Sequence, residues 1–521
     1  MYITQADIAK LRVQAGAAMG IGAILKDLLT KDKASEEYNQ AIIGELYYRG
    51  EHDILKHDFR RDTIATTDAE GKETTETFVN PNRSNHLEVH PWLFTHIEQK
   101  VAYISGKEPS VLVDGAKRGE DGSPANDEQR YQDELAKTTG ARWADVLADW
   151  ETAASWGGVA WLHEYLDAAG KLRQAVIPRT EGIPIYDGQY QRELVEFIRH
   201  YLVTVNEAGR EKQVTRVEWW TAQDVTYYID DGQGNFKLDP DVQQNPAPHF
   251  WDVTTATADD GVTRVETRRD ARSWGRVPFV ELPNNAGRTT DLKRYKTLID
   301  AYDLIRSKGT NNLMDFNEFW TIIQGFGGDL ASAMAKRLKI NQAVSITSQG
   351  GNVEMKQLSL DMKGRIDWLK ELRDAIHEFG MAVDVNPDRI GNAPSGVSLK
   401  FQYTLLDLKA NRMISKLKTA LQQHFAFVTE MLNRQGSTWD AEKVSATINK
   451  SLITNDAETV TMLAQSQGLV PEKLLLANHP LVEDADQAYK DLLEEREAKA
   501  VAQREVFGQA PPGGDGGDDD E

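Results

Sequence analysis

The stretch GNAPSGVSLKFQY, from Gly391 to Tyr403, comes within one residue of a phosphate-binding loop. In the pattern G-x-x-x-x-G-K-[ST], the glycines let backbone N–H groups approach the phosphates, and the lysine meets the β and γ phosphates. Here the glycines are correctly spaced and Ser398 is present, but Val397 occupies the lysine position. The alternatives are a nucleotide loop that lacks its cation and a glycine-containing loop with another role.

The residues around this stretch favour the second alternative. A phosphate loop follows a buried apolar strand, whereas the preceding HEFGMAVDVNPDRI contains Pro387 and several charged residues. Lys400 falls four residues after Gly396, too far along the chain to replace the missing lysine. We therefore expect a structural loop that enters a helix, with Ser395 as its candidate cap.

The rest of the chain offers no catalytic or metal-binding pattern. With no cysteine, disulfides and thiolate chemistry are excluded, and the 11 histidines include no H-E-x-x-H pair. A Gly-x-Ser-x-Gly nucleophile elbow is also absent from the sequence. One copy of the calcium repeat G-G-x-G-x-D, at 513–518, cannot stack with another, so we interpret it as part of a solvated acidic tail. We predict a protein that is not an enzyme and has no catalytic residues, cofactor or metal.

The net charge of the chain limits the kinds of molecule that it can bind tightly. A net charge of −21 over 521 residues argues against tight binding of nucleic acid through its phosphates. One segment departs from this balance: between Ser395 and Arg434, bases outnumber Asp407 and Glu430. The bases are Lys400, Lys409, Arg412, Lys416, Lys418 and Arg434. Either this is an ordinary helix with a basic face, or the helix faces a polyanion or the acidic side of a neighbouring subunit.

The elements that carry these residues divide the chain in two. The N-terminal half predicts two helices within residues 5–50, a loop or hairpin at Arg60–Thr77, a helix from Pro91 to Gly106 and helical segments over Asp127–Trp156. Short β-type runs then continue to Leu282, with connections too short for parallel crossovers. The 12 tryptophans fit core or subunit contacts better than platforms for bases. We find no leader-like start and no long uncharged apolar run, and expect a soluble protein without membrane contact.

The C-terminal half is expected to be nearly all helical. Apolar residues at helical spacing predict helices over Asp291–Trp320 and Asp361–Phe379, and a third continues from the opening stretch to Leu432. Between the first two lies a Gly-rich segment with strand-like pieces, and shorter helices follow Gly436. The fold class is therefore α+β, predominantly helical.

The order of these parts resembles a known family. The run VPFVELPNN is followed by DLKRYKTLIDAYDLIRSKGTNNLMDF and later by WLKELRDAIHEFGMAVDVNPDRIGNAPSGVSLKFQYTLLDLKANR. Upstream stand YYRGEHDIL and NRSNHLEVHPWLFTHIEQKVAYISGKEPSV, and downstream GLVPEKLLLANHPLVEDADQAYKDL. Over about residues 35–495 the chain resembles the portal proteins of tailed bacteriophages, of the type found in the Bacillus phage SPP1.

The resemblance implies a portal fold with wing, stem, clip and crown parts around a central channel. Its expected parts are a wing at 1–289, a first stem helix at 290–319, a clip at 320–360, a second stem helix at 361–380, a tunnel loop at 381–395, a long kinked helix at 396–432, a helical crown at 433–500 and a disordered acidic tail at 501–521.

The resemblance also implies a function and partners. The protein would form a ring, probably of twelve subunits, at one capsid vertex, through which double-stranded DNA enters during packaging and leaves at ejection without sequence specificity. The clip would bind the terminase large subunit and head-completion or adaptor proteins, and the ring would meet the major capsid and scaffolding proteins. Assembly would take place in the host bacterial cytoplasm, and the product would lie in the virion.

Three groups of site residues follow from the resemblance. The tunnel-loop candidates are Asp384, Asn386, Asp388, Arg389 and Asn392. The channel-lining candidates on the long helix are Lys400, Lys409 and Arg412. The clip candidates are Phe326, Asp329, Lys336, Arg337 and Lys339. Two other functions remain open: a packaging ATPase, disfavoured by Val397, and a minor head or scaffold-like protein without a channel.

Overall fold

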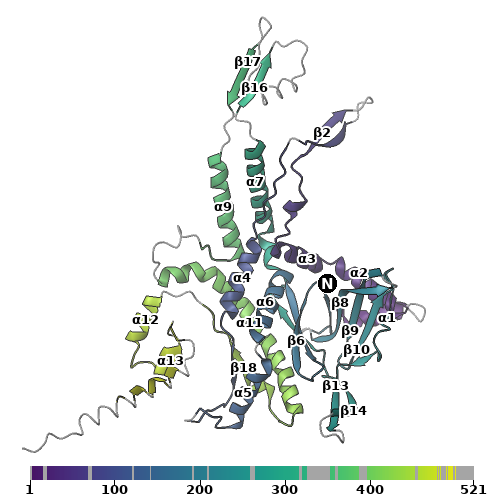
Figure 1. Cartoon of the computed structure of the whole chain (residues 1–521), viewed down its shortest axis with the longest axis vertical. Helices are drawn as coiled ribbons and strands as arrows, with labels where there is room; N and C mark the ends of the chain where they lie inside the picture. Colours follow the sequence, from purple (N-terminus) through teal and green to yellow (C-terminus); the bar gives the residue numbers. More distant parts are fainter. Residues whose placement is uncertain are drawn as a thin grey trace, which may run out of the picture. The chain divides into compact units, whose positions relative to one another are not determined.

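A computed structural model gives the fold of most of the chain (Figure 1). The structure describes residues 3–15, 20–67, 73–81, 83–119, 122–140, 142–189, 193–207, 210–257, 264–315, 319–324, 352–357, 362–385, 396–451, 456–477, 479, 481–482, 488–489, 491–493, 495–496 and 499. These residues fall into two compact units, one formed by 1–384 with 405–451 and the other by 385–404 with 452–521.

The helices occupy both halves of the chain. They are α1 (Gln5–Ala15), α2 (Ile21–Lys33), α3 (Glu36–Tyr48), α4 (Trp92–Ser105), α5 (Asp127–Thr139), α6 (Trp143–Gly157), α7 (Lys296–Asp315), α9 (Met362–Gly380), α11 (Gly396–Arg434), α12 (Asp456–Gln465) and α13 (Glu472–Ala477). Short 3-10 turns are η1 (Asp53–Lys56), η2 (Asp291–Arg294) and η3 (Ala441–Lys443). Of the helices, α12 and α13 belong to the second unit, and α11 enters the first unit at residue 405.

The largest sheet lies in the first unit and has the strand order β1-β7-β8-β9-β10-β11, with β12 beside β10. Its strands are β1 (Ile3–Thr4), β7 (Gly182–Tyr186), β8 (Leu194–Glu207), β9 (Arg210–Trp220), β10 (Asp224–Asp230), β11 (Phe236–Leu238) and β12 (Ala247–Pro248). Helices α1 and α2 bury their apolar side chains against it, including Ile8 and Leu25, which meet Ile198 and Val217 in one core cluster. Burial of these aliphatic side chains is the main force that holds the layer together.

A second sheet has the order β15-β5-β6, formed by β5 (Val159–Leu166), β6 (Leu172–Pro178) and β15 (Phe279–Pro283). Trp161 of β5 is fully buried in a cluster with Phe197 of the large sheet and Phe279 of β15. Phe279 stacks on Phe197 with ring centroids 4.1 Å apart. The two sheets therefore share one aromatic core.

In the described residues, four smaller strand pairs accompany these two sheets. They are β2 (Arg61–Thr67) with β3 (Glu73–Val79), β4 (Ser110–Val113) with β18 (Val444–Thr447), β13 (Phe250–Thr257) with β14 (Arg264–Arg272), and β16 (Phe319–Gln324) with β17 (Asn352–Gln357). Each pair is antiparallel.

Helices α7 and α9 pack side by side and run in opposite directions (Figure 1). Near the end of α7, a Cβ atom on Gly309 would lie 3.2 Å from Nη1 of Arg365, close to the start of α9. At the other end, a Cβ atom on Gly380 would lie 3.5 Å from Cζ of Tyr295, just before α7. These two contacts reflect the antiparallel arrangement, and at Gly309 the absence of a side chain leaves room for Arg365.

The structure confirms most elements that the sequence predicts and corrects two. Residues 5–50 form three helices and not two, because Gly20 and Ser35 begin new helices, and the Ser35 side chain accepts a hydrogen bond from Tyr38 N. The helix expected over Asp291–Trp320 is shorter at both ends: η2 precedes it, and Phe319 begins the strand β16. Aromatic and β-branched residues in FWTII favour a strand over a helix.

The remaining helices lie close to their predicted bounds. The helix expected at Asp361–Phe379 is α9, Met362–Gly380, and the helix expected from Gly396 to Leu432 is α11, Gly396–Arg434. The antiparallel pairing expected up to Leu282 is also present, with the addition of the parallel pair β1 and β7, which joins residues far apart in the sequence.

Candidate functional site

Helix α7 carries a ladder of polar side chains that holds an extended segment, Ser84 to His90, along its length. Asp303, Ser307, Asn311 and Asp315 recur every four residues, so they lie on one face of the helix. In the order in which the segment runs, Ser84 N donates to Asp315 Oδ1 at 2.9 Å, His86 N to Asn311 Oδ1 at 2.7 Å, Glu88 N to Ser307 Oγ at 2.9 Å, and His90 N to Asp303 Oδ1 at 3.1 Å.

The ladder forms because the spacing of polar side chains along the helix matches the spacing of alternate amides along the extended segment. Four residues of helix advance about 6 Å, and two residues of extended chain advance about 6.6 Å. Every second amide of the segment therefore meets the next polar side chain of the helix. The buried Asp303 also contacts His52 Nδ1 at 2.6 Å and His90 Nδ1 at 2.8 Å, which ties the segment before α4 and the turn after α3 to α7.

Where α7 begins, a buried ionic cluster joins elements from distant parts of the chain. Asp291 of η2 lies 2.7 Å from Nζ of Lys100 on α4 and 3.0 Å from Nζ of Lys409 on α11. Asn284 Nδ2 donates to the same carboxylate at 2.8 Å. Burial alone would raise the pKa of Asp291, but the two ammonium groups and the amide outweigh it and lower that pKa.

The same burial acts on the partners of this cluster. Desolvation lowers the pKa of Lys100 to about 8, although the negative charge of Asp291 opposes the shift. Beside it on α6, burial raises the pKa of Glu151 to about 8, against the hydrogen bond that Ser105 Oγ donates to this carboxyl. The cluster thus fixes η2, α4 and α11 relative to one another through buried ion pairs.

The chain that leaves α9 is held beside this cluster. Lys409 Nζ donates to the carbonyl of Gly380 at 3.0 Å, and Gln99 pairs with both backbone polar groups of Val383. Arg373 forms an ion pair with Asp384 at 2.7 Å, and His377 Nε2 lies 3.8 Å from the same carboxylate. Among the predicted tunnel-loop residues, Asp384 is the one that the structure describes, and it stands at the root of that segment.

The structure places the other predicted site residues as follows. Lys409 is directed into the ionic cluster, with 12% of its side chain exposed. Arg412, one turn on, is exposed and forms no ion pair with any described residue; with Arg294 it borders a recess of about 40 Å³. Lys400 lies in the first turns of α11. Outside the described residues lie Asn386, Asp388, Arg389, Asn392, Phe326, Asp329, Lys336, Arg337 and Lys339.

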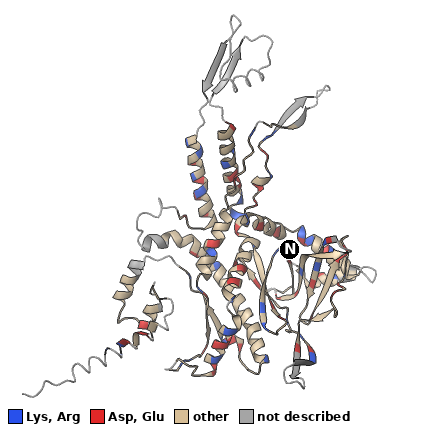
Figure 2. Ribbon diagram, in the orientation of Figure 1, with Lys and Arg blue, Asp and Glu red and all other residues tan. Residues whose placement is uncertain are grey.

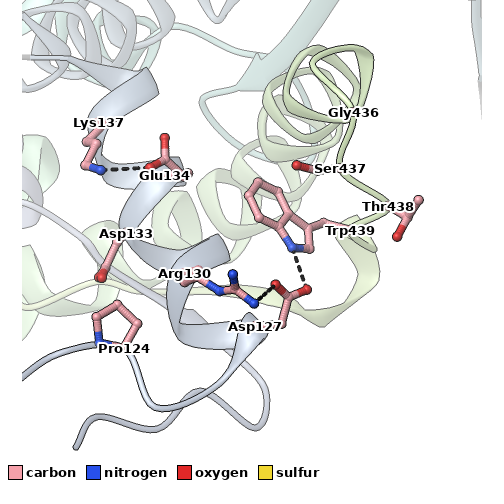
Figure 3. Close-up of a pocket in the computed structure, with 10 residues that line it drawn as sticks. All are labelled: Pro124, Asp127, Arg130, Asp133, Glu134, Lys137, Gly436, Ser437, Thr438 and Trp439. Carbon is pink, nitrogen blue, oxygen red and sulfur yellow. Dashed lines mark hydrogen bonds and ion pairs between the residues drawn. The ribbon is translucent and has the colours of Figure 1, made fainter.

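A larger groove, of about 600 Å³, lies between α5 and the turn after α11 (Figure 3). Its charged groups satisfy one another: Arg130 pairs with Asp127 at 2.9 Å, and Lys137 with Glu134 at 2.7 Å. Trp439 Nε1 donates to Asp127 Oδ2 at 2.9 Å, as the dashed line in Figure 3 marks. Because these groups are paired and exposed, the groove does not present an activated acid, base or nucleophile.

Among the described residues, no three histidine, aspartate or glutamate side chains gather as metal ligands could. In the same residues, no helix combines the length and apolar character needed to cross a bilayer.

The residues that the sequence analysis missed are those that hold the helices together, such as Gln99, Lys100 and Asp291. Nothing in their local sequence marks them, because their partners lie on elements far along the chain. The ladder of α7 does leave a signal: polar residues at every fourth position of an otherwise amphipathic helix, from Asp303 to Asp315.

Comparison with known proteins gives the family. The family model described as "Phage portal protein, SPP1 Gp6-like" matches residues 29–502. The portal protein of Bacillus phage SPP1 is 27% identical over 495 residues, which cover 94% of this chain and 89% of that protein. The portal protein of Clostridium phage phiCD119 is 30% identical over 357 residues, 66% of this chain and 72% of that protein.

Similarity to solved structures is weaker. The neck of a native gene transfer agent particle, computed with C12 symmetry, matches with a TM-score of 0.36 and 10% identity, over 74% of this chain and 89% of that one. The virion of such a particle matches with a TM-score of 0.37 and 11% identity, over 75% and 90%. The assignment depends on the sequence matches, which span the helices and sheets described above: the chain belongs to the SPP1 Gp6-like family of phage portal proteins.

Proposed function

We propose that this portal protein forms a closed ring, of twelve subunits in the virion, whose central channel conducts double-stranded DNA at one vertex of the capsid. Membership of a portal family supports this proposal, since portal proteins are structural components of the phage particle and not a catalytic family. The ring passes DNA inward during packaging and outward during ejection.

The observation that carries the ring is an apolar surface left open on α9 and α7. Trp368 and Phe379, three turns apart on α9, are 56% and 55% exposed, and Met314 on α7 is 63% exposed. Acidic and basic residues are interspersed along both helices (Figure 2). Large apolar side chains exposed beside mixed charges are typical of a protein interface, and in a portal protein a second copy of the chain is its natural occupant.

Within this ring we assign the parts by the order of the family. The wing is 1–289, and α7 and α9 form the stem, with the clip at 320–360 between them. The tunnel loop is 381–395, followed by the helix α11 and a crown at 433–500. The clip is the docking site for the terminase large subunit and then for head-completion or adaptor proteins. Capsid and scaffolding proteins surround the ring, which is assembled in the host bacterial cytoplasm.

Weak binding of DNA suits a channel through which DNA must slide. Each phosphate that a protein neutralises adds a salt-dependent contribution to binding, so a channel that lets DNA slide benefits from an acidic subunit, here with a net charge of −21. Lys409 is neutralised by Asp291, which leaves Arg412 and Lys400 as the candidates on α11 for contact with the DNA.

Deletion of residues 385–392 tests the channel assignment. Rings should still form, because the contacts at Gly380 to Asp384 and along α7 and α9 remain. Particles assembled with the shortened protein should package or retain less DNA than those with the full chain. Normal DNA content in such particles would show that the segment 381–395 is not the part of the ring that meets DNA.

A further inference from the structure

The four residues after α9 form a tightly specified turn. Met381 N donates to Glu378 O at 3.1 Å and Ala382 N to His377 O at 3.0 Å, the pair of bonds that defines a Schellman helix end. The left-handed position of this motif usually holds glycine, but here it is Met381, with φ +52°. A non-glycine residue in this conformation is strained, so the surroundings must hold it in place.

Gln99 of α4 supplies the first of these restraints. Its Nε2 donates to Val383 O at 3.0 Å, and its Oε1 accepts from Val383 N at 3.1 Å. One carboxamide thus satisfies both backbone groups of a residue that is 5% exposed, as a neighbouring β-strand would. No described strand pairs with this segment, so the side chain of Gln99 takes the place of one.

Arg373 and Lys409 supply the others. Arg373, two turns before the end of α9, binds the carboxylate of Asp384 at 2.7 Å, and this carboxylate is 10% exposed. Lys409 of α11 binds Gly380 O at 3.0 Å on the other side of the turn. Behind the turn stands His96 of α4: a Cβ atom on Gly380 would lie 2.5 Å from its Nδ1, so the turn has no room to move that way.

We propose that Gln99, Arg373 and Lys409 are positioning residues of the portal channel, which together set the direction in which the main chain leaves α9. They belong to three helices, α4, α9 and α11, and they hold successive points of the chain, Val383, Asp384 and Gly380. The inference rests on the proposed function, because it is the channel assignment that makes this direction important: it determines where residues 385 onward are presented to DNA.

Gln99→Leu tests the restraint with little change in side-chain volume. With two hydrogen bonds lost, hydrogen exchange in the peptide that spans residues 381–385 should become at least about tenfold faster, while exchange in α7 and α9 stays unchanged. Rings should form as before, and particles assembled with the variant should contain several-fold less DNA. Thr95→Ala, an exposed position one turn away on α4, is the matched control and should alter neither readout.

A second pair of variants covers the case in which Gln99→Leu fails to fold. Arg373 is one-third exposed, so its replacement does not open the core. Arg373→Lys keeps the cation opposite Asp384 and should preserve DNA content; Arg373→Met removes the cation and should lower DNA content and speed local exchange. Lys409 is left unchanged because it also neutralises the buried Asp291.

The outcomes separate the two proposals. Faster local exchange with normal DNA content in particles would overturn the positioning role while leaving the channel intact. Unchanged local exchange in both Gln99→Leu and Arg373→Met would overturn it as well. A wild-type protein that forms no rings would instead refute the proposed function, whatever the exchange of residues 381–385.

Discussion

Single buried residues decide how the helices of this protein are joined. The ionic cluster at Asp291 and the carboxyl of Glu151 lie in the interior, where an unpaired charge is costly and each group must find a partner or a proton. From the sequence, Asp291 and Glu151 are indistinguishable from the solvated acids of helix surfaces. The role of Asp291 depends on Lys409 and Lys100, which lie 118 and 191 positions away along the chain, and that of Glu151 depends on burial by α4. Neither leaves a local pattern.

The buried carboxyl of Glu151 should make the stability of the folded protein depend on pH. The pKa of Glu151 is raised to about 8 by burial, against about 4.5 in the unfolded chain. Between these two values the folded state keeps a proton that the unfolded state releases, so the stability that this proton provides is lost as the pH rises from 4.5 to 8. The loss is about 1.4 kcal/mol per pH unit.

The variant Glu151→Gln should remove this loss, because an amide stays neutral and still accepts the hydrogen bond from Ser105. In urea unfolding at pH 5, 6.5 and 8, its midpoint should rise relative to that of the unchanged protein as the pH increases. Glu134→Gln, on α5 with 41% of its side chain exposed, is the control and should leave the two pH profiles parallel. Parallel profiles for Glu151→Gln would mean that this carboxyl is ionised in the folded protein.

At the scale of elements, hydrophobic periodicity was a good guide to helices and a poor guide to their ends. It located α4, α9 and α11 to within about two residues, because their apolar faces repeat every three or four positions. It did not separate α1 from α2, which begins after its N-cap Gly20, and it missed the pairing of β1 with β7. Such long-range pairing depends on tertiary packing and has no local signal.

The ladder of polar side chains on α7 should contribute to the stability of the protein. Asn311 is 4% exposed and makes two hydrogen bonds with the backbone of His86. Asn311→Ala leaves both of these backbone groups without a partner, and the free energy of unfolding should fall by about 1–3 kcal/mol. Asn312→Ala, the next residue and exposed, should change it by less than about 0.5 kcal/mol. Equal effects in denaturant titrations would exclude the ladder as a source of stability.

At the scale of the whole molecule, the family could be predicted from the order of several motifs, and the sequence matches confirm it. Family membership disfavours the nucleotide-loop alternative for the stretch from Gly391 to Ser398. That Gly396 begins α11 suits either alternative, because a phosphate loop also leads into a helix. The division into wing, stem, clip and crown stays a prediction, as do the roles of the tunnel-loop and clip residues.

Assembly should depend on the apolar surface of α9. Trp368→Glu places a charge on this surface, and because the side chain is 56% exposed in the single chain, the variant should fold normally. In a ring it would bury an unpaired carboxylate, which is strongly unfavourable, so sedimentation should show mostly monomers. Lys370→Glu, also on α9 and 73% exposed, introduces a carboxylate at a polar position; it is the control and should assemble. Normal assembly of Trp368→Glu would place the subunit contact elsewhere.

Electron microscopy of the purified full-length protein at micromolar concentration can show whether this chain forms a ring around a channel. Averaged images should show closed rings with a central hole and rotational symmetry. Particles that remain single subunits under these conditions, and that also hydrolyse ATP, would contradict this expectation and return the stretch from Gly391 to Ser398 to the role of a nucleotide loop.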